Sequence, residues 1–359
     1  MEKTLVMKNI LICIPTLKKG GCEKQAALLA SVLKDDFNVK IVLFYPKSGF
    51  EPELVKISGL EDEDIIKLSG SMLQKMWQLG KTIRKGKFDT MFCYLTAPDF
   101  YGTIVGRLCG VKKIYLGLRN AYLPKGKIVL ERIASQFATS AIVNNFAGVD
   151  VFSKFGIKKQ IVIPNCYPSP HDYKVHHERE FVEVITVARF VAQKDYATAI
   201  GAFAMASKQD ERLRFKIIGH GELESEIRQM VKIHSIDDKV KILINPPKII
   251  EHLLDSDIYL STSLFEGTSN SIMEAMDASL PIIATNVGDN SHLVRDGVNG
   301  YITNIKDIDT ISSKLLKLSS SSQMRAEMGR KGNEILHTEY SVEKFRESYQ
   351  SLINSDEKQ

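Results

Sequence analysis

Short apolar runs alternate with segments of helical periodicity along the first half of the chain. The apolar runs lie at residues 9–16, 38–45, 90–95, 112–118, 140–145 and 160–165. Segments in which apolar residues recur with helical spacing lie between several of them, at 22–34, 76–87, 98–110 and 128–138. Near-continuous apolar runs are typical of parallel strands, which helices cover on both faces. The alternation therefore predicts an α/β fold with a doubly wound parallel sheet.

The same alternation restarts after residues 167–181, which we interpret as a linker because prolines, histidines and mixed charges interrupt the pattern. Strands are predicted at 183–189, 214–219, 240–245, 257–262, 281–287 and 300–303, with helices at 196–207, 222–234, 249–255, 271–278 and from about residue 307. We expect one Rossmann-like domain over 1–166 and another over 182–335. Helices over 336–359 could cross back to the first domain. Two such domains would face each other across a cleft at the carboxyl ends of their strands.

Composition excludes several classes of protein. No apolar run is long enough to span a bilayer, and the first one, ILICIP, lacks the pattern of a signal peptide. The cysteines are odd in number and show no C-x-x-C spacing, which argues for a reducing compartment and against a disulfide frame or zinc site. They are Cys13, Cys22, Cys93, Cys109 and Cys166. We therefore expect a cytoplasmic protein.

Charge is unevenly distributed along the chain. Residues 1–170 contain 25 Lys and Arg against 14 Asp and Glu, a balance of +11, whereas residues 171–359 contain 23 against 29, a balance of −6. The basic half could meet nucleic acid, an anionic membrane or an acidic substrate, or could be a solvated surface. No nucleic-acid motif supports the first option.

One helical segment combines apolar and basic residues and could lie on an anionic membrane. In the stretch 72–87, Met72, Met76, Leu79 and Ile83 have helical spacing, Leu73 and Trp77 stand beside them, and basic residues are interspersed. Packing against the core is the plainer interpretation of the apolar stripe. The basic residues could still face a membrane surface.

The stretch FEGTSNSIMEAMDASLP, residues 265–281, has the residues expected of a sugar-nucleotide site. Glu266 lies in a predicted loop, and Glu274 lies one turn inside a predicted helix. The small residues between them end at a helix start, where free N–H groups favour an anion. Carboxylates can accept hydrogen bonds from sugar hydroxyls. Alternatively, Ser269 or Asn270 is simply a helix cap and Glu274 a solvated acid.

Two cations and two glycine pairs follow predicted strands. Arg189 ends the strand 183–189 and Lys194 follows it, so both could neutralise a diphosphate leaving group, or form a solvated basic pair. Glycines let the backbone approach a ligand closely, or form a tight turn. These glycines are Gly20 and Gly21 after the first strand, and Gly219 and Gly221 after the strand 214–219.

No metal site is expected from the sequence. Asp255 and Asp257 form a D-x-D pattern, but they join a helix to a strand away from the predicted loop edge. No predicted element fixes the linker histidines, His171, His176 and His177.

The order of these motifs resembles the retaining glycosyltransferases of family 4, which have the GT-B fold, over essentially the whole chain. The most specific part runs from Phe265 to Gly300. The resemblance implies a nucleotide-diphosphate-sugar donor, which we expect to be a UDP-sugar, and transfer with anomeric retention and no bound metal or other cofactor. It also implies a glycan or lipid-linked glycan acceptor in surface polysaccharide synthesis, and peripheral contact with the inner face of the membrane.

The resemblance also implies roles for individual residues. Arg189, Lys194 and Glu266 would be catalytic, the two cations holding the diphosphate and Glu266 the sugar. Glu274 would bind the ribose. Further donor-binding residues would be Gly20, Gly21, Asn165, Gly219, Gly221, Gly267, Thr268, Ser269 and Asn270. Asp99 and Arg119 would lie on the acceptor side, with Arg119 standing where many relatives have a histidine.

Two other functions stay open at this point. One is a GT-B sugar-nucleotide epimerase, which would act on donor alone. The other is a nucleotide-sugar-binding protein without catalytic activity.

Overall fold

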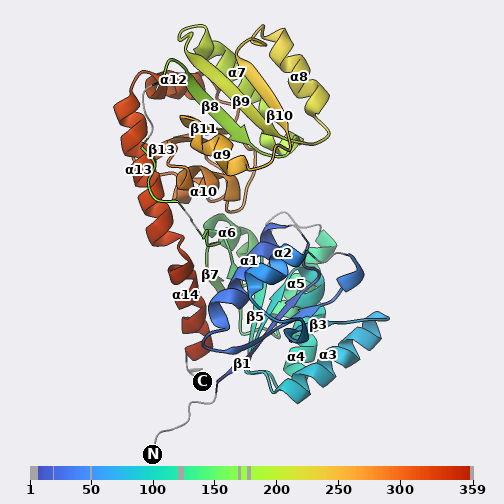
Figure 1. The fold of residues 1–359 in the computed structure, drawn as a ribbon. Coiled ribbons are helices and arrows are strands. Elements are labelled where there is room, and N and C mark those ends of the chain that lie inside the picture. The colour runs from blue at the N-terminus through green and yellow to red at the C-terminus, as the bar shows by residue number, and fades with distance from the viewer. Residues whose placement is uncertain are drawn as a thin grey trace, which may run out of the picture. The chain divides into compact units, whose positions relative to one another are not determined.

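The computed structural model describes residues 7–18, 20–48, 51–119, 125–168, 171–175 and 179–355. Their contacts divide the chain into two compact units (Figure 1). The N-terminal unit contains Met1–Cys166 together with Val342–Gln359, and the C-terminal unit contains Tyr167–Ser341. The predicted linker histidines His176 and His177 lie outside the described residues.

A parallel sheet forms the centre of the N-terminal unit, with the strand order β3-β2-β1-β4-β5-β6-β7. Its strands are β1 (Asn9–Ile14), β2 (Asn38–Leu43), β3 (Ile65–Lys67), β4 (Thr90–Tyr94), β5 (Lys113–Leu118), β6 (Ser140–Val143) and β7 (Gln160–Val162). The order reverses direction between β1 and β4. Neighbouring strand ends that diverge at such a reversal leave room for a ligand at the carboxyl edge.

Helices cover both faces of this sheet. They are α1 (Gly21–Leu33), α2 (Pro52–Ser58), α3 (Met72–Gly86), α4 (Thr103–Leu108), α5 (Lys125–Ser135), α6 (Phe146–Lys154) and α14 (Val342–Asn354), with a π-helical turn at Pro98–Gly102. Buried residues of α1, α2 and α14 share one core cluster. Those of α3 and α4, and those of α5 and α6, form two clusters against other strand side chains. The arrangement confirms a doubly wound sheet with helices on both faces.

The C-terminal unit repeats this architecture, with the strand order β10-β9-β8-β11-β12-β13. Its strands are β8 (Val182–Val187), β9 (Leu213–Gly219), β10 (Val240–Ile244), β11 (Ile258–Ser261), β12 (Ile282–Thr285) and β13 (Gly300–Thr303). Its helices are α7 (Tyr196–Ser207), α8 (Glu224–Ile233), α9 (Ile249–Leu254), α10 (Asn270–Asp277), α11 (Asn290–Leu293), α12 (Ile308–Ser319) and α13 (Ser322–Glu339). Here too neighbouring strands pair in parallel, as predicted.

The chain returns to the N-terminal unit through α14, which packs against α1 (Figure 1). Phe345, Tyr349 and Ile353 of this helix are buried in the core cluster of α1 and β1. At its carboxyl end, the ammonium groups of Lys8 and Lys113 both donate to the backbone oxygen of Ile353, each at 3.0 Å. Cations at that end stabilise a helix because its last carbonyl groups lack partners within the helix.

The described part of 167–181 packs on the C-terminal unit. The Tyr167 backbone N–H donates to the Tyr340 oxygen at 3.0 Å, and the Lys174 N–H donates to Ser279 Oγ at 3.0 Å. The His171 imidazole lies 2.9 Å from the buried Asp277 carboxylate at the end of α10. This segment is therefore fixed by hydrogen bonds where the structure describes it.

Across the described ranges, no helix is both long enough and apolar enough to cross a membrane.

Candidate functional site

Lys194 and Glu266 meet at the carboxyl edge of the C-terminal sheet. Lys194 ends a 3-10 turn (Ala192–Lys194) after β8, and Glu266 lies in the loop between β11 and α10. The Lys194 ammonium contacts Glu266 Oε1, and Ser263 Oγ donates to the same oxygen at 2.8 Å. Both charged side chains are largely buried, with 14% and 11% of their surfaces exposed. Charge interactions strengthen as water is excluded. The attraction between these two side chains is therefore stronger than that of an exposed ion pair.

Hydrogen bonds tie together the two loops that present this pair. Thr262 Oγ1 donates to the backbone oxygens of Lys194 and Asp195, both at 2.9 Å. Gln193 forms two hydrogen bonds with the other loop. Its side-chain Nε2 donates to the Phe265 backbone oxygen at 2.7 Å, and its backbone oxygen accepts from the Leu264 N–H at 2.8 Å. The positions of Lys194 and Glu266 are therefore set by backbone contacts as well as by their own ion pair.

Arg189 lies two residues beyond the end of β8, with an exposed side chain. None of the carboxylates that the structure describes lies within ion-pair distance of its guanidinium. A free guanidinium near the end of a central strand is available to bind an anion.

The helix α10 begins beside Glu266 without a side-chain cap. Ser269 is the N-cap residue, but its hydroxyl makes no capping bond and lies 3.2 Å from Ser271 Oγ. The first-turn N–H groups therefore lack the side-chain acceptor that usually satisfies one of them, so a ligand oxygen could take that place. Residues 267–270 lead from the loop into the first turn of this helix, as the sequence predicted.

Glu274 lies one turn inside α10 and interacts electrostatically with Tyr259 of β11. Burial raises the pKa of Tyr259 well above its usual range, and the Glu274 and Glu266 carboxylates contribute in the same direction. Both predicted carboxylates therefore lie within electrostatic range of Tyr259.

Gly219 and Gly221 are explained by close packing between strand ends. A Cβ atom on Gly219 would lie 1.9 Å from the Ala188 oxygen, and one on Gly221 would lie 2.5 Å from the Phe190 oxygen. Gly221 also has φ of +151°, which side chains disfavour. These glycines allow the β9 end to pack on the loop that leads to Lys194.

Gly288, which sequence reasoning missed, has the same kind of role. Its φ is +55°, and an added Cβ would lie 2.4 Å from the Glu266 oxygen. The next residue, Asp289, donates its N–H to the Gly267 oxygen at 3.2 Å. The sequence feature that could have identified Gly288 is its place in a polar segment directly after a predicted strand.

The remaining predicted residues lie in the N-terminal unit. Gly20 is the N-cap of α1, with φ of −163°, an extended backbone that any residue can adopt, and Gly21 begins the helix. Asn165 is buried and accepts a bond from Arg119 Nη1 at 3.1 Å. The structure therefore places Asn165 beside Arg119, whereas the sequence assigned the two to different substrates.

Asp99 lies in the π-helical turn after β4, where it faces Glu131 of α5. Both side chains are buried, and each has one carboxyl oxygen without a hydrogen-bond partner among the described residues, Asp99 Oδ1 and Glu131 Oε2. Burial, above all, raises the pKa of Glu131 to about 7, while bonds from Thr96 and Asp99 partly oppose the shift. Burial and the Glu131 charge raise the pKa of Asp99 well above its usual range. Two such carboxyls favour a state in which a proton is shared.

Sequence reasoning also missed Glu131. The spacing of the sequence could have identified it. Ile128, Glu131 and Ala134 follow one another at three-residue spacing on the buried side of α5. A charged residue on an apolar stripe indicates a buried interaction.

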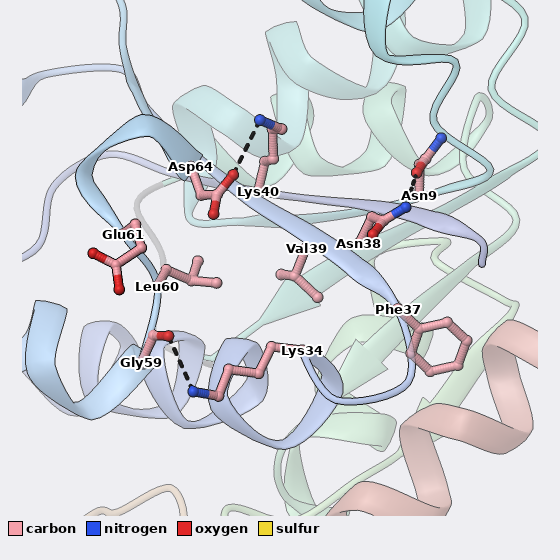
Figure 2. Close-up of a pocket in the computed structure, with 10 residues that line it drawn as sticks. All are labelled: Asn9, Lys34, Phe37, Asn38, Val39, Lys40, Gly59, Leu60, Glu61 and Asp64. Atoms are coloured by element: carbon pink, nitrogen blue, oxygen red, sulfur yellow. Dashed lines mark hydrogen bonds and ion pairs between the residues drawn. The ribbon is translucent and has the colours of Figure 1, made fainter.

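A surface pocket near the opposite edge of the N-terminal sheet is lined by residues that bond to one another. Figure 2 shows Asn9 and Asn38, at the amino ends of β1 and β2, joined at 2.9 Å. Lys34 Nζ donates to the Gly59 oxygen at 3.0 Å, and Lys40 pairs with Asp64 at 3.0 Å. This pocket lies away from the carboxyl edge and contains none of the predicted site residues.

The D-x-D residues take part in structural contacts. Asp257 Oδ2 accepts from the Glu183 backbone N–H at 2.8 Å, and Asp255 pairs with Arg179 at 2.8 Å. Within the described part of the chain, no group of three or more His, Cys, Asp or Glu side chains is arranged to hold a metal ion.

Part of the chain matches a family of known proteins. Residues 172–335 match the family described as glycosyl transferases group 1. The chain is 26% identical over 240 residues to a poly(ribitol-phosphate) alpha-N-acetylglucosaminyltransferase of Staphylococcus aureus, covering 66% of this chain and 48% of the relative. The chain thus spans about half the length of that relative.

Two further proteins match over most of their length. A Campylobacter jejuni enzyme is 24% identical over 311 residues, covering 78% of this chain and 81% of the relative. It is named N-acetylgalactosamine-N,N'-diacetylbacillosaminyl-diphospho-undecaprenol 4-alpha-N-acetylgalactosaminyltransferase. The crystal structure of Anabaena HepE in complex with UDP superposes with a TM-score of 0.81 at 16% identity, covering 98% of this chain and 100% of HepE. Residues 172–335 therefore resemble the glycosyl transferases group 1 family, and the chain has the GT-B fold.

Proposed function

We propose that this enzyme transfers a sugar from a UDP-sugar to a glycan or lipid-linked glycan acceptor in surface polysaccharide synthesis. The transfer retains the anomeric configuration and needs no metal, as in family 4. The observation that carries the proposal is the Lys194–Glu266 pair beside the uncapped start of α10, with the free Arg189 guanidinium on the neighbouring strand end. These groups match the charges and hydroxyls of a nucleotide-diphosphate sugar.

The cations act on the leaving group. When the bond between the sugar C1 and the diphosphate oxygen breaks, its electron pair stays on that oxygen. Lys194, Arg189 and the first N–H groups of α10 stabilise the negative charge that develops. A divalent metal would provide the same stabilisation in other enzymes, so these groups support a metal-free reaction.

The carboxylates bind the neutral parts of the donor. Glu266, fixed by Ser263 and Lys194, accepts bonds from sugar hydroxyls, and the backbone of Gly267–Asn270 supplies N–H donors. Glu274 accepts from the ribose hydroxyls. The acceptor oxygen then bonds to C1 on the face that the diphosphate leaves, and its proton passes to the departing phosphate oxygen. These reaction steps balance in atoms and charge, and they need no nucleophile from the protein.

The relatives support the substrate classes. UDP is bound in the HepE structure, which has the same fold. The Campylobacter relative is named for a diphospho-undecaprenol-linked acceptor, and the Staphylococcus relative for poly(ribitol-phosphate). We propose that Asp99 and Arg119 serve the acceptor, because they lie in the other unit from the Lys194–Glu266 pair.

A membrane surface is a further proposed partner. The helices α3, α4 and α5 share one side of the N-terminal sheet and expose large apolar side chains among basic ones. We call this set the apolar-basic face; its exposed apolar residues are Leu73, Trp77, Leu108, Val129 and Ile133. Such a surface suits peripheral contact with anionic lipid at the inner face of the cell membrane.

A donor panel tests the proposal. The enzyme is incubated with UDP-, GDP- and ADP-sugars, with and without a crude lipid-linked acceptor fraction, and the released nucleotide diphosphate is measured. We expect release from a UDP-sugar that grows with acceptor and persists in EDTA, and NMR of the product should show the donor's anomeric configuration. Loss of activity in EDTA that manganese or magnesium restores would overturn metal independence. Conversion of the donor sugar without acceptor would instead show an epimerase. Donor binding without turnover would show a nucleotide-sugar-binding protein without catalytic activity.

A further inference from the structure

Arg119 follows the carboxyl end of β5, where neutral groups hold its guanidinium. Its Nη1 donates to Asn165 Oδ1 at 3.1 Å, and its Nη2 donates to the Tyr349 hydroxyl at 3.4 Å. The guanidinium carbon lies 4.9 Å from the centre of the Tyr94 ring. Tyr94 and Tyr349 in turn join through their hydroxyls at 3.1 Å. The cation is thus oriented by three elements of the N-terminal unit.

This guanidinium has no counter-ion among the residues that the structure describes. Its Nε atom is buried and has no acceptor among the described residues. The Asp99 carboxyl group interacts with it electrostatically, but burial and Glu131 raise the pKa of Asp99 well above its usual range, which favours the neutral acid. Asp99 also bonds towards Gly117 and Glu131. Arg119 is half-buried, and a cation that is partly removed from water without an opposite charge is costly, so an anionic ligand would stabilise it.

We propose that Arg119 binds an anionic group of the acceptor, a phosphate or a carboxylate. This inference rests on the proposed function and gives the acceptor a chemical class. The planar fork of a guanidinium suits both anions, because it can donate two parallel bonds to two oxygens. An anion here would neutralise the charge that the described groups of the protein leave uncompensated.

Tyr349 is a positioning residue for this site. It comes from α14, far along the chain, and its hydroxyl lies between Arg119 and Tyr94. Its burial in the core of the N-terminal unit fixes the hydroxyl in place. The return of the last helix therefore contributes to substrate binding, in addition to covering the sheet.

The same anion chemistry could come from the donor diphosphate, so the test must separate the two sources. The full-length enzyme is saturated with UDP, which fills the donor site, and inorganic pyrophosphate is then titrated and followed by ³¹P NMR. We expect pyrophosphate to bind beside UDP in the wild type. Arg119→Gln should weaken that binding about tenfold or more and leave UDP affinity unchanged.

Three further variants complete the test. Arg119→Lys keeps the charge without the fork and should weaken pyrophosphate binding less than Arg119→Gln does. Tyr349→Phe should weaken it a fewfold while UDP affinity stays constant. Arg132→Gln, an equal change of charge at an exposed position on α5, should have no effect.

Specific results would overturn the inference. Pyrophosphate that fails to bind beside UDP in the wild type would do so, as would equal affinities in the wild type and Arg119→Gln. A loss of UDP affinity in Arg119→Gln would assign the guanidinium to the donor instead. Failure of every UDP-sugar to react, with Arg119-dependent pyrophosphate binding intact, would reject the proposed function while the anion site stands.

Discussion

At the scale of single residues, the site depends on charges that are partly removed from water. Lys194 and Glu266 stabilise each other in the C-terminal unit, and Arg119 lacks a described counter-ion in the N-terminal unit. A charge that is already desolvated and oriented has less to lose when a substrate arrives. Substitutions at these positions should therefore change catalysis or binding more than folding.

Lys194→Ala and Arg189→Ala should each slow transfer severely. Each variant would lose one proposed charge-assisted contact to the leaving diphosphate, which is worth roughly 2–4 kcal/mol of activation barrier. Steady-state kinetics with the preferred UDP-sugar measures the effect, and thermal unfolding confirms that each variant folds. Lys208→Ala, beyond the end of α7, is the matched control for charge. Near-normal turnover in both variants would reject their catalytic role.

Glu266→Ala and Glu274→Ala should differ in their kinetic effects. Glu266 would lie by the sugar, which gains positive character in the transition state, so its loss should mainly lower kcat. Glu274 would hold the ribose, which changes little during the reaction, so its loss should mainly raise KM. Initial rates over a range of donor concentrations separate the two parameters. The opposite pattern would mean that the two roles are exchanged.

Glu131→Gln should reduce the pH dependence of stability. The pKa of Glu131 is about 7 in the folded protein against an ordinary 4.5, so between these values the folded state binds more protons than the unfolded state. The free energy of unfolding should therefore fall as pH rises through this window, by about 2–3 kcal/mol. Urea unfolding at pH 5 and pH 8 measures the loss, which should shrink in Glu131→Gln. The exposed Glu53→Gln is the control, and equal slopes in all three proteins would contradict the assignment.

At the scale of elements, α3 shows why periodicity alone left two interpretations open. Leu79 and Ile83 of its apolar stripe are buried, as core packing requires. Leu73 and Trp77, one position along from the stripe, are 78% and 68% exposed. Lys81 extends this exposed line, with its ammonium 5.5 Å from the centre of the Trp77 ring. The helix therefore has both a core side and an outward apolar side.

Removing the outward apolar side should weaken membrane binding. The double variant Leu73→Ser and Trp77→Ser should bind anionic vesicles about tenfold less, since each lost side chain is worth on the order of 1.5–3 kcal/mol when fully buried and these are buried in part. Co-sedimentation with vesicles of rising anionic lipid content at two salt concentrations measures this. Wild-type binding should grow with anionic lipid and fall with salt. Ile233→Ser, on an exposed apolar position of α8, is the control. Wild-type protein that stays unbound at low salt would favour a soluble acceptor.

At the scale of the whole molecule, the last helix belongs to the first unit. Phe345 packs in the core cluster of α1 and β1, and its ring centre lies 4.8 Å from that of Tyr349. The stability of the N-terminal unit therefore depends on residues that follow the entire C-terminal unit in sequence.

Phe345→Ala should destabilise the N-terminal unit by about 3–5 kcal/mol, because it leaves a cavity in that core. Differential scanning calorimetry, with hydrogen exchange to assign each transition, should show the loss in β1 and α1 but leave the strands of the C-terminal unit protected as before. The exposed Glu347→Ala on the same helix should have little effect. Equal loss of protection in both units would contradict a separate role for α14.

The sequence by itself determined the fold class and the local context of the residues proposed to bind the donor. Alternating apolar runs and helical segments identify parallel strands, and each strand except the short β3 was predicted, because its hydrophobicity is local. The helices α2, α6 and α11 were not predicted, since they are short and packing stabilises them more than their own pattern does. Glu266, Glu274 and Lys194 could be placed on loops and helices for the same local reason.

Only the tertiary structure decided which distant residues meet. Lys194 contacts Glu266 because parallel pairing brings the ends of β8 and β11 together. Glu131 faces Asp99 because α5 packs beside the π-helical turn, and Tyr349 reaches Arg119 because α14 returns to the first sheet. These pairings depend on the topology of the chain. The local spacing of residues along the sequence does not specify that topology. Burial and charge compensation, which determine what each group can bind, follow from that topology.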